Sequence, residues 1–336
     1  MADQLPFFSI VVPTRDRPGR LATCLASLAA LNYPGDRFEV IVVDDGSRGS
    51  LACVVDEFRD RLDLTLLEQA NAGPAAARNT GARQSRGSYL AFTDDDCAPE
   101  TSWLRAFATR FAAAPSHMVG GRTLNALPDM PYSAASQSII DVVYAHYNAD
   151  PDRPRFFASN NVAVPKALLL AAGGFDPAFH TAEDRELCHR WLSSGYGMSF
   201  EPDALVHHAH LLTLGSFSRQ HFAYGRGAYQ FHHLRAARES GRIQLEHGFY
   251  AKLLRHPLSV RPWRRRGVLA SLLVLAMAAN TAGFFWERAA QLVGDRDRVT
   301  KRSPAPRAHK NPAAYAICDK ASKAASGSDR THSPCE

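Results

Sequence analysis

The stretch Tyr89-Leu-Ala-Phe-Thr-Asp94-Asp95-Asp96-Cys97-Ala-Pro99 organises the chain. An apolar run ends there in three consecutive carboxylates, and a proline follows soon after. Adjacent negative charges repel one another and lose hydration on burial, so such a triplet favours a bound cation. Hard divalent ions prefer oxygen ligands, and one or two carboxylates plus substrate phosphates hold them. We therefore predict that Asp94 and Asp96 place a metal ion against a nucleotide diphosphate. The alternative is a solvated acidic turn that caps a helix beginning near Glu100.

The bulk composition is that of a globular protein. With 336 residues, 46% of them hydrophobic, the chain is long enough for one large or two smaller domains. Its net charge of +6 suits acidic partners such as nucleotide phosphates, anionic lipid or nucleic acid. The six cysteines show no paired spacing, which indicates free thiols in a reducing compartment. The first residues lack the basic and apolar regions of a secretory signal, so none is expected.

Strand-like and helix-like segments alternate along the first third of the chain. Apolar runs over 7–13, 38–43, 62–67 and 88–93 predict buried strands, and the segments between them carry helical patterns. This alternation predicts an α/β fold with a parallel sheet, in which ligands bind at the carboxyl ends of the strands. Asp44 and Asp45 end one strand as the acidic triplet ends another. Both acidic groups are therefore expected to face one cleft.

The alternation becomes irregular beyond about residue 115. A strand is expected over 156–164, followed by a helix that opens at Thr181 with Glu183 and Asp184. The threonine is predicted to cap this helix, and the two carboxylates then have a favourable place in its dipole as an alternative to a catalytic role. Glycine-rich dinucleotide and Walker motifs are missing from the expected contexts, which makes redox chemistry on a dinucleotide a poor interpretation.

Five motifs together resemble the family 2 glycosyltransferases. They are Val12-Pro13-Thr14-Arg15, Val43-Asp44-Asp45-Gly46-Ser47, Asn71-Ala-Gly-Pro-Ala-Ala-Ala-Arg78-Asn79, Phe92-Thr-Asp94-Asp95-Asp96 and Glu183-Asp184. The resemblance covers residues 7–230 and implies a GT-A type, Rossmann-like fold with a mostly parallel central sheet. It implies a nucleotide-binding part over 1–115 and an acceptor-binding part over 116–230. It also implies transfer of a sugar from a nucleotide sugar with inversion, and a divalent metal, Mn²⁺ or Mg²⁺.

The resemblance also implies roles for individual residues. Asp184 matches the catalytic base, with Glu183 beside it. Asp96, as the last carboxylate of the D-x-D element, is implied as a metal ligand together with Asp94, and His208 is implied by register to approach the metal and diphosphate. The residues expected to bind the nucleotide sugar are Pro13, Thr14, Arg15, Asp45, Arg78, Asp94 and Asp95.

Other polar residues have more than one possible role. Arg226 lies in a Tyr-Gly-Arg-Gly segment, which is either a flexible loop that brings the guanidinium to the diphosphate or part of a basic helix surface. Asn160 and Asn161 either hydrogen-bond acceptor hydroxyls or satisfy a turn. His207 and His210, which flank His208 in sequence, are interpreted as surface or packed imidazoles.

A helical, basic and apolar region is expected over 231–297, with a disordered tail over 298–336. Residues 267–286 carry no formal charge and follow the arginine cluster 261–266. A membrane span, a helix in the membrane interface and a buried core helix are all compatible with this pattern. We favour peripheral or monotopic association with an anionic membrane from the cytoplasmic side, at the inner face of the cell membrane.

The leading hypothesis is an inverting, metal-dependent glycosyltransferase whose hydroxyl acceptor belongs to a surface polysaccharide or glycolipid, for example a lipid-linked glycan. No nucleic-acid partner is expected. A nucleotidyltransferase also uses carboxylate-held Mg²⁺ on a nucleotide, but it leaves Glu183 and Asp184 unexplained. A catalytically silent protein that binds nucleotide sugars is the third alternative.

Overall fold

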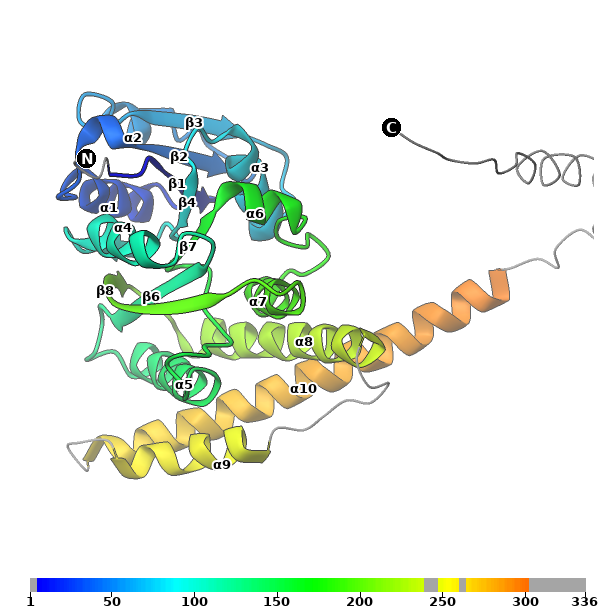
Figure 1. The fold of residues 1–336 in the computed structure, drawn as a ribbon. Coiled ribbons are helices and arrows are strands. Elements are labelled where there is room, and N and C mark those ends of the chain that lie inside the picture. Colours follow the sequence, from blue (N-terminus) through cyan, green and yellow to red (C-terminus); the bar gives the residue numbers. More distant parts are fainter. Residues whose placement is uncertain (1–4, 239–246, 260–263, 302–336) are drawn as a thin grey trace, which may run out of the picture. The chain divides into compact units, whose positions relative to one another are not determined.

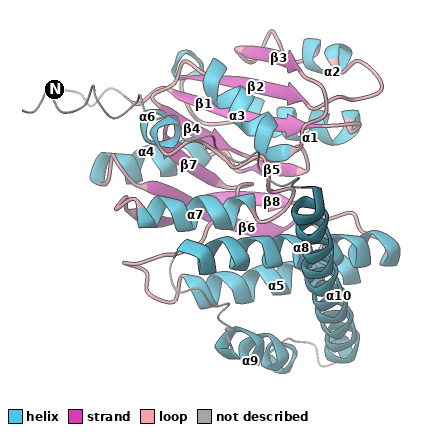
Figure 2. Ribbon diagram, turned by 90° about the vertical axis from the view of Figure 1, so that its right-hand side faces the viewer, coloured by secondary structure: helices cyan, strands magenta, loops and turns pink. Residues whose placement is uncertain are grey.

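The computed structural model describes residues 5–238, 247–259 and 264–301, and the described strands form one eight-stranded sheet (Figures 1 and 2). The strand order is β3-β2-β1-β4-β7-β6-β8-β5. The strands are β1 (Phe8–Thr14), β2 (Phe38–Asp44), β3 (Leu64–Glu68), β4 (Tyr89–Phe92), β5 (Cys97–Pro99), β6 (Met118–Asn125), β7 (Val162–Pro165) and β8 (Met198–His208). The α-helices are α1 (Pro18–Ala29), α2 (Ala52–Asp56), α3 (Pro74–Gln84), α4 (Trp103–Ala113), α5 (Pro131–Tyr147), α6 (Lys166–Ala171), α7 (Glu183–Ser193), α8 (Leu214–Arg238), α9 (His247–Arg255) and α10 (Arg264–Lys301). Short 3₁₀ helices lie at Gly35–Arg37 and His256–Ser259.

The first half of the sheet is the predicted parallel sheet, with helices on both faces. Strand β1 pairs in parallel with β2 and with β4, and β2 pairs in parallel with β3. Alternate residues of β1 point to opposite faces: Ile10 packs with α1 and α4, whereas Val11 packs with α3 and α7. Because both faces are covered, these strands have apolar residues at consecutive positions. Strand β2 ends opposite Thr14 and β4 ends opposite Val11, so the segments that follow them leave the sheet on the two sides of β1.

The second half of the sheet includes antiparallel pairs. Strand β7 is antiparallel to both β4 and β6, while β6 and β8 are parallel. Strand β7 begins only at Val162, so most of the strand predicted over 156–164 is irregular. The acidic triplet leads into the short strand β5, whose antiparallel pairing places Cys97 opposite His208. The sequence did not predict this strand, and it is what brings His208 to the triplet.

Helix α7 begins as predicted near Glu183, but its cap differs from the prediction. The residue before the helix is Ala182, which has a left-handed φ of 66°, and no side chain caps the first turn. The hydroxyl of Thr181 instead donates to the Ala223 carbonyl of α8 at 2.9 Å. A left-handed alanine is sterically strained, and such strain is concentrated at functional sites. The predicted Thr181 cap is therefore wrong, since a tertiary contact uses that hydroxyl.

Helices α8 and α10 lie side by side (Figures 1 and 2), and glycines allow their backbones to approach closely. A Cβ atom at Gly225 would lie 1.9 Å from the Asn280 carbonyl oxygen, and one at Gly283 would lie 2.0 Å from the Phe222 carbonyl oxygen. A Cβ atom at Gly227 would lie 2.5 Å from the carbonyl oxygen of Thr181. The Tyr-Gly-Arg-Gly segment is thus helical, and its glycines permit close approach where side chains would clash.

The C-terminal apolar segment is one long helix. Among the described residues, α10 is the helix long and apolar enough to cross a membrane by length and composition, over Arg266–Val293. Part of its surface packs against the rest of the protein, because Leu269, Leu273 and Ala276 join a core cluster with α5, α8 and α9. The chain divides into a compact unit that ends at Ala289 and a second unit from Ala290. Helix α10 continues to Lys301, into the predicted tail, and residues 302–336 lie outside the described residues. Of the arginine cluster, Arg261 also lies outside them, whereas Arg264, Arg265 and Arg266 begin α10.

We predict that Gly225→Leu separates α10 from α8. The larger side chain has no space against the Asn280 backbone, so the free energy of unfolding should fall by about 1–3 kcal/mol. Thermal or denaturant unfolding, together with protease cleavage in α10, measures the effect. The control is Gly215→Leu at the exposed start of α8, where the only neighbour within 4 Å of a Cβ atom is the flexible end of Arg219. Equal effects of the two substitutions would contradict the close packing.

Candidate functional site

One large cavity lies at the carboxyl ends of β1, β2 and β4. Its volume is about 1070 Å³, and its wall continues onto α5, α8, α9 and α10. The two acidic strand ends predicted to face one cleft, Asp45 and Asp94–Asp96, both line this cavity. The other predicted site residues that line it are Pro13, Thr14, Arg15, Arg78, Asn160, Glu183, Asp184 and His208.

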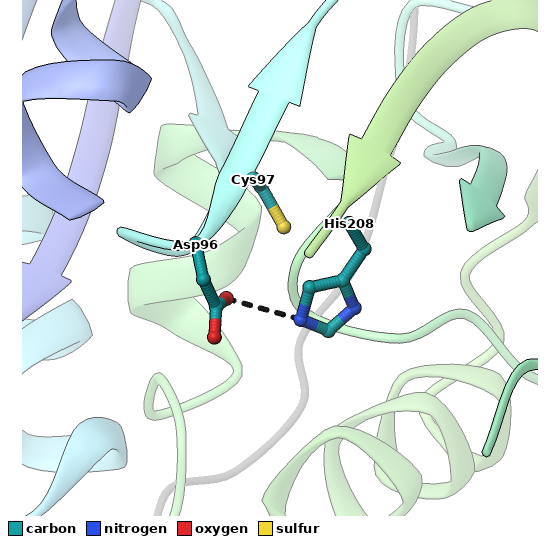
Figure 3. Close-up of side chains that lie close together, drawn as sticks. All are labelled: Asp96, Cys97 and His208. Carbon is teal, nitrogen blue, oxygen red and sulfur yellow. Dashed lines mark ion pairs between the residues drawn. The ribbon is translucent and has the colours of Figure 1, made fainter. Parts of the chain in front are cut away.

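Asp96 and His208 form the part of the site suited to a metal ion (Figure 3). The pairing of β5 with β8 holds them together, and an Asp96 carboxylate oxygen lies 3.0 Å from Nε2 of His208. Burial alone would raise the pKa of Asp96, but the hydrogen bond and charge of His208 and the charge of Arg17 outweigh it and lower the pKa to about 2. The carboxylate is therefore ionised at neutral pH and can serve as a ligand.

Cys97 belongs geometrically to the same cluster. Asp96, Cys97 and His208 each offer one possible ligand atom, and these three atoms lie within 4.8 Å of one another. Burial, followed by the nearby carboxylates, raises the pKa of the Cys97 thiol well above its usual value. A protonated thiol is a poor ligand, and hard ions prefer oxygen. The donor set that remains, a carboxylate and an imidazole, fits a divalent ion such as Mn²⁺.

His210 supports His208 from behind. Its Nε2 lies 2.6 Å from Nδ1 of His208, and the amide nitrogen of Asn160 lies 3.1 Å from the same atom. Burial, with the charge of His208, lowers the pKa of His210 to about 3, so this imidazole is neutral. Nε2 of a neutral His210 ring can accept a hydrogen bond from the Nδ1–H of His208, which turns Nε2 of His208 towards Asp96 and the cavity. A ligating histidine is usually supported in this way. His210 thus has a positioning contact that the sequence analysis assigned to simple packing.

Asp95 faces the protein more than the cavity. It is buried, accepts a hydrogen bond from the Thr14 hydroxyl at 2.8 Å and pairs with Arg17 at 3.1 Å. Burial raises its pKa to about 6, although Arg17 opposes the rise. Arg20 completes the cationic side of the site, since its Nη1 lies 2.9 Å from Asp96. Arg17 and Arg20 were not predicted; a signal for them is their place in the first turns after a strand that ends at the cavity.

Arg78 joins the two halves of the site. Its buried guanidinium donates to Asp94 at 2.7 Å and to Glu183 at 2.9 Å. Burial by itself would lower the pKa of Arg78, but the two carboxylates raise it above its usual value. Arg78 was predicted as a contact to the nucleotide. The structure shows that its side chain already links the end of β4 to the first turn of α7.

Asp184 lies beside this link and lines the cavity. Burial raises the pKa of Asp184 to about 7, and the adjacent Glu183 carboxylate adds to the rise. The backbone N–H of Arg185 donates to its carboxylate at 2.7 Å and opposes the rise, as does the charge of Arg78. A carboxylate with a pKa near neutrality is ionised often enough to accept a proton and basic enough to hold it.

The Asp45 carboxylate is fully hydrogen-bonded within the protein. One oxygen accepts from the Gln69 amide and the Ala72 N–H, and the other from the Asn71 amide and the Gly73 N–H, at 2.7–2.9 Å. In this arrangement Asp45 fixes the loop 71–73 that begins α3, and it has no unused acceptor site for a nucleobase. Asn71 lines the cavity next to it.

Two predicted residues lie away from the cavity. Nε of Arg226 donates to Glu287 on α10 at 2.7 Å, so the helical alternative applies and its contact is with that helix. The side chain of Asn161 accepts from the Trp103 indole and donates to the Arg122 and Ala204 carbonyls. Because these bonds use its amide fully inside the core, Asn161 has a structural role, and only Asn160 of this pair faces the cavity.

Helix α8 contributes His221, which the sequence did not single out, and Tyr224, which begins the Tyr-Gly-Arg-Gly segment. His221 and Tyr224 both line the cavity, and Nε2 of the buried His221 has no hydrogen-bond partner among the described residues. Burial lowers the pKa of His221 to about 4. His221 and Tyr224 are three residues apart, which places them on one face of a helix. The sequence reveals this only if the segment is already known to be helical.

Comparisons with known proteins point to one family of enzymes. Residues 9–160 match the family described as Glycosyl transferase family 2. The chain is 27% identical over 233 residues to glycosyltransferase AglE of Haloferax volcanii, covering 68% of this chain and 75% of AglE. It is 29% identical over 228 residues to the pre-mycofactocin glycosyltransferase of Mycobacterium tuberculosis, covering 66% of this chain and 46% of that protein.

The fold resembles that of a solved glycosyltransferase. The structure of mannosyltransferase PcManGT from Pyrobaculum calidifontis, in complex with GDP-Man and Mn²⁺, superposes with a TM-score of 0.57 at 20% identity. The alignment covers 89% of this chain and 82% of PcManGT. This likeness confirms the predicted GT-A type fold with a mostly parallel sheet. Residues 9–160 therefore form a glycosyl transferase family 2 domain, and the relatives that the chain matches are glycosyltransferases.

Proposed function

We propose that this enzyme transfers a sugar from a nucleotide-diphosphate sugar to a hydroxyl acceptor with inversion, with Asp184 as the general base. The observation that carries the proposal is the placement of Asp184, with its pKa near 7, in the same cavity as the ionised Asp96 and His208. One end of the cavity thus suits a diphosphate with its cation, and Asp184 supplies a proton acceptor.

The proposed reaction is a single displacement. The acceptor oxygen attacks the anomeric carbon as the bond to the diphosphate oxygen breaks, and Asp184 takes the hydroxyl proton. The leaving group departs as a nucleoside diphosphate with the bonding electron pair. One base is sufficient for this reaction, and a displacement without a covalent intermediate inverts the anomeric centre. Glu183 does not take the proton in this proposal, because its carboxylate is paired with Arg78.

The cation site and the arginines would serve the leaving group. Asp96 and His208, with Asp94 nearby, would hold a divalent ion, Mn²⁺ or Mg²⁺, which as a Lewis acid stabilises charge that develops on the phosphate. Arg17 and Arg20 now neutralise Asp95 and Asp96 and are half-exposed at the cavity, so they can donate to phosphate oxygens. The Mn²⁺ and GDP-Man in the complex of PcManGT support this choice of ligands.

The acceptor and the membrane belong to the same proposal. Exposed apolar side chains lie on α9, on the 3₁₀ helix His256–Ser259 and on α10; among them are Leu254, Leu258, Val274, Phe285 and Trp286. Such a surface is typical of contact with lipid, and α10 is packed against the domain on its other side. We therefore infer peripheral or monotopic association at the inner face of the cell membrane, with an acceptor that belongs to a surface polysaccharide or glycolipid.

Asp184→Asn should abolish the base without disturbing donor binding. We expect kcat to fall by about 10²–10⁴-fold, measured as nucleoside diphosphate release with the nucleotide sugar that gives the largest thermal shift. Binding of that donor with Mn²⁺ should stay within about twofold of the wild-type affinity. Asp203→Asn, at an exposed position outside the cavity, is the matched control. Transfer at a near wild-type rate by Asp184→Asn would disprove the assignment of the base.

Asp96→Ala should weaken metal-dependent binding of nucleoside diphosphates. Removal of the ionised carboxylate that pairs with His208 should cost at least about tenfold in apparent Mn²⁺ affinity, read from thermal shifts with UDP, GDP and dTDP. Cys97→Ala is the control within the same cluster, and we expect it to leave the Mn²⁺ titration unchanged because the thiol is protonated. An unchanged titration for Asp96→Ala would remove this residue from the metal site.

The raised pKa of Asp184 also predicts a pH-dependent cost in stability. An aspartate in the unfolded chain has a pKa of about 3.9, whereas that of Asp184 in the fold is about 7. The folded state therefore binds the proton more tightly, and the stability that this adds at low pH is lost as the pH rises from about 4 to about 7. Asp184→Asn should therefore gain about 1–3 kcal/mol in unfolding free energy relative to the wild type between pH 4 and pH 8. Denaturant titrations at several pH values measure this gain. A difference that stays constant with pH would contradict the raised pKa.

A further inference from the structure

The cavity has a second, apolar part beyond the carboxylates. Helices α5, α9 and α10 line it with Ile140, Val143, Phe249, Leu253, Ala276 and Met277, which we call the apolar chamber. These three helices and α8 share one core cluster, so the chamber lies within a packed helical layer. The figures show α5, α9 and α10 on the same side of the sheet (Figures 1 and 2).

The apolar chamber is continuous with the surroundings of Asp184. Val143 and Tyr147 lie one turn apart on α5, and both line the cavity. The Tyr147 hydroxyl accepts a hydrogen bond from Arg185, whose backbone N–H donates to Asp184. A ligand that extends from Asp184 past Tyr147 therefore enters the chamber.

The cavity is larger than a single small ligand, such as the nucleotide sugar, requires. A single small ligand is commonly held in a pocket of about 300–1,000 Å³, and this cavity measures about 1070 Å³. Its charged end suits a nucleotide diphosphate. The apolar chamber offers little to a sugar or a phosphate, because both would lose hydration there without gaining hydrogen bonds.

We propose that the apolar chamber binds the hydrocarbon tail of the acceptor, so that the acceptor is a lipid whose head group reaches Asp184. This inference rests on the proposed function, since it assigns the acceptor to the same cavity. The occupant is a lipid tail because the helices that line the chamber also carry the exposed apolar side chains of the outer surface. Val274 and Trp286 of α10 and Leu254 of α9 are on that surface. The exposed cations Lys252 and Arg255 of α9 complement an anionic head group or bilayer.

Photolabelling of the full-length protein in phosphatidylcholine nanodiscs tests the location of the tail. The probe is a farnesyl phosphate that carries a diazirine in its tail, and labelled peptides are identified by mass spectrometry. We expect labels on the inward positions Val143, Leu253 and Met277. An excess of dodecyl phosphate should reduce this labelling at least fivefold, whereas butyl phosphate, which has the same head group, should not. Labels confined to the outward positions Val274 and Trp286, or equal competition by butyl phosphate, would overturn the proposal.

Substitutions within the helices give a matched comparison. Val143→Trp fills the chamber from a half-buried position and should lower labelling of Leu253 and Met277 about tenfold. Val274→Trp adds the same side chain to the exposed face of α10 and should leave this labelling unchanged. Thermal shifts with nucleoside diphosphate and Mn²⁺ should be equal in both variants and the wild type, which shows that the fold and the polar end are intact.

The remaining outcomes separate this proposal from its alternatives. The tail site would be overturned if Val143→Trp left the labelling unchanged. It would also be overturned if labelling fell as the protein concentration rose, because a second copy of the chain would then cover the chamber. If Val143→Trp fails to fold, Met277→Trp provides the same test from α10. Photolabelling needs no nucleotide sugar, so it tests the tail site separately from the proposed function. If the wild type and all variants failed to bind nucleoside diphosphates but were still labelled in the chamber, the proposed function would be wrong and the tail site would stand.

Discussion

The site depends on one buried guanidinium. Arg78 on α3 bridges Asp94 at the end of β4 and Glu183 at the start of α7, and no other side chain described here makes an ion pair to both. A buried charge is tolerated only with partners, and removal of one partner from such a group typically costs about 3–5 kcal/mol. The link therefore fixes the distance between the diphosphate end of the cavity and the residue next to it, Asp184. Two carboxylates that would repel each other are held together by the same cation.

The sequence predicted the parallel half of the sheet well, because its signals are local. Continuous apolar runs in β1, β2 and β4 reflect burial on both faces, and the carboxylates after β2 and β4 mark the end where ligands bind. The five motifs were sufficient to recognise the family. Cavity residues that directly follow these strands, such as Thr14 and Asp96, were accordingly found in advance.

Other features could not be read from the sequence, because they depend on contacts between distant segments. Asn161 has the same residue type as Asn160, but a single indole and two carbonyls in the core use its amide. The sequence left Arg226 either at the diphosphate or on a helix surface, and only the position of α10 shows that it pairs with Glu287. The three-residue strand β5 is shorter than any pattern can reveal, yet it delivers His208 to Asp96.

The glycine contacts of α8 have a mechanical consequence. Gly225 and Gly283 allow the backbones of α8 and α10 to touch, and Gly227 touches the backbone of Thr181, two residues before Glu183. A spacer side chain can change rotamer and absorb a small shift of its helix, whereas backbone against backbone cannot. Tilting of α10 by the thickness or tension of a surrounding bilayer would thus be passed through α8 to the strained turn at Ala182. A movement of α10 would therefore reach the first turn of α7, which carries Glu183 and Asp184.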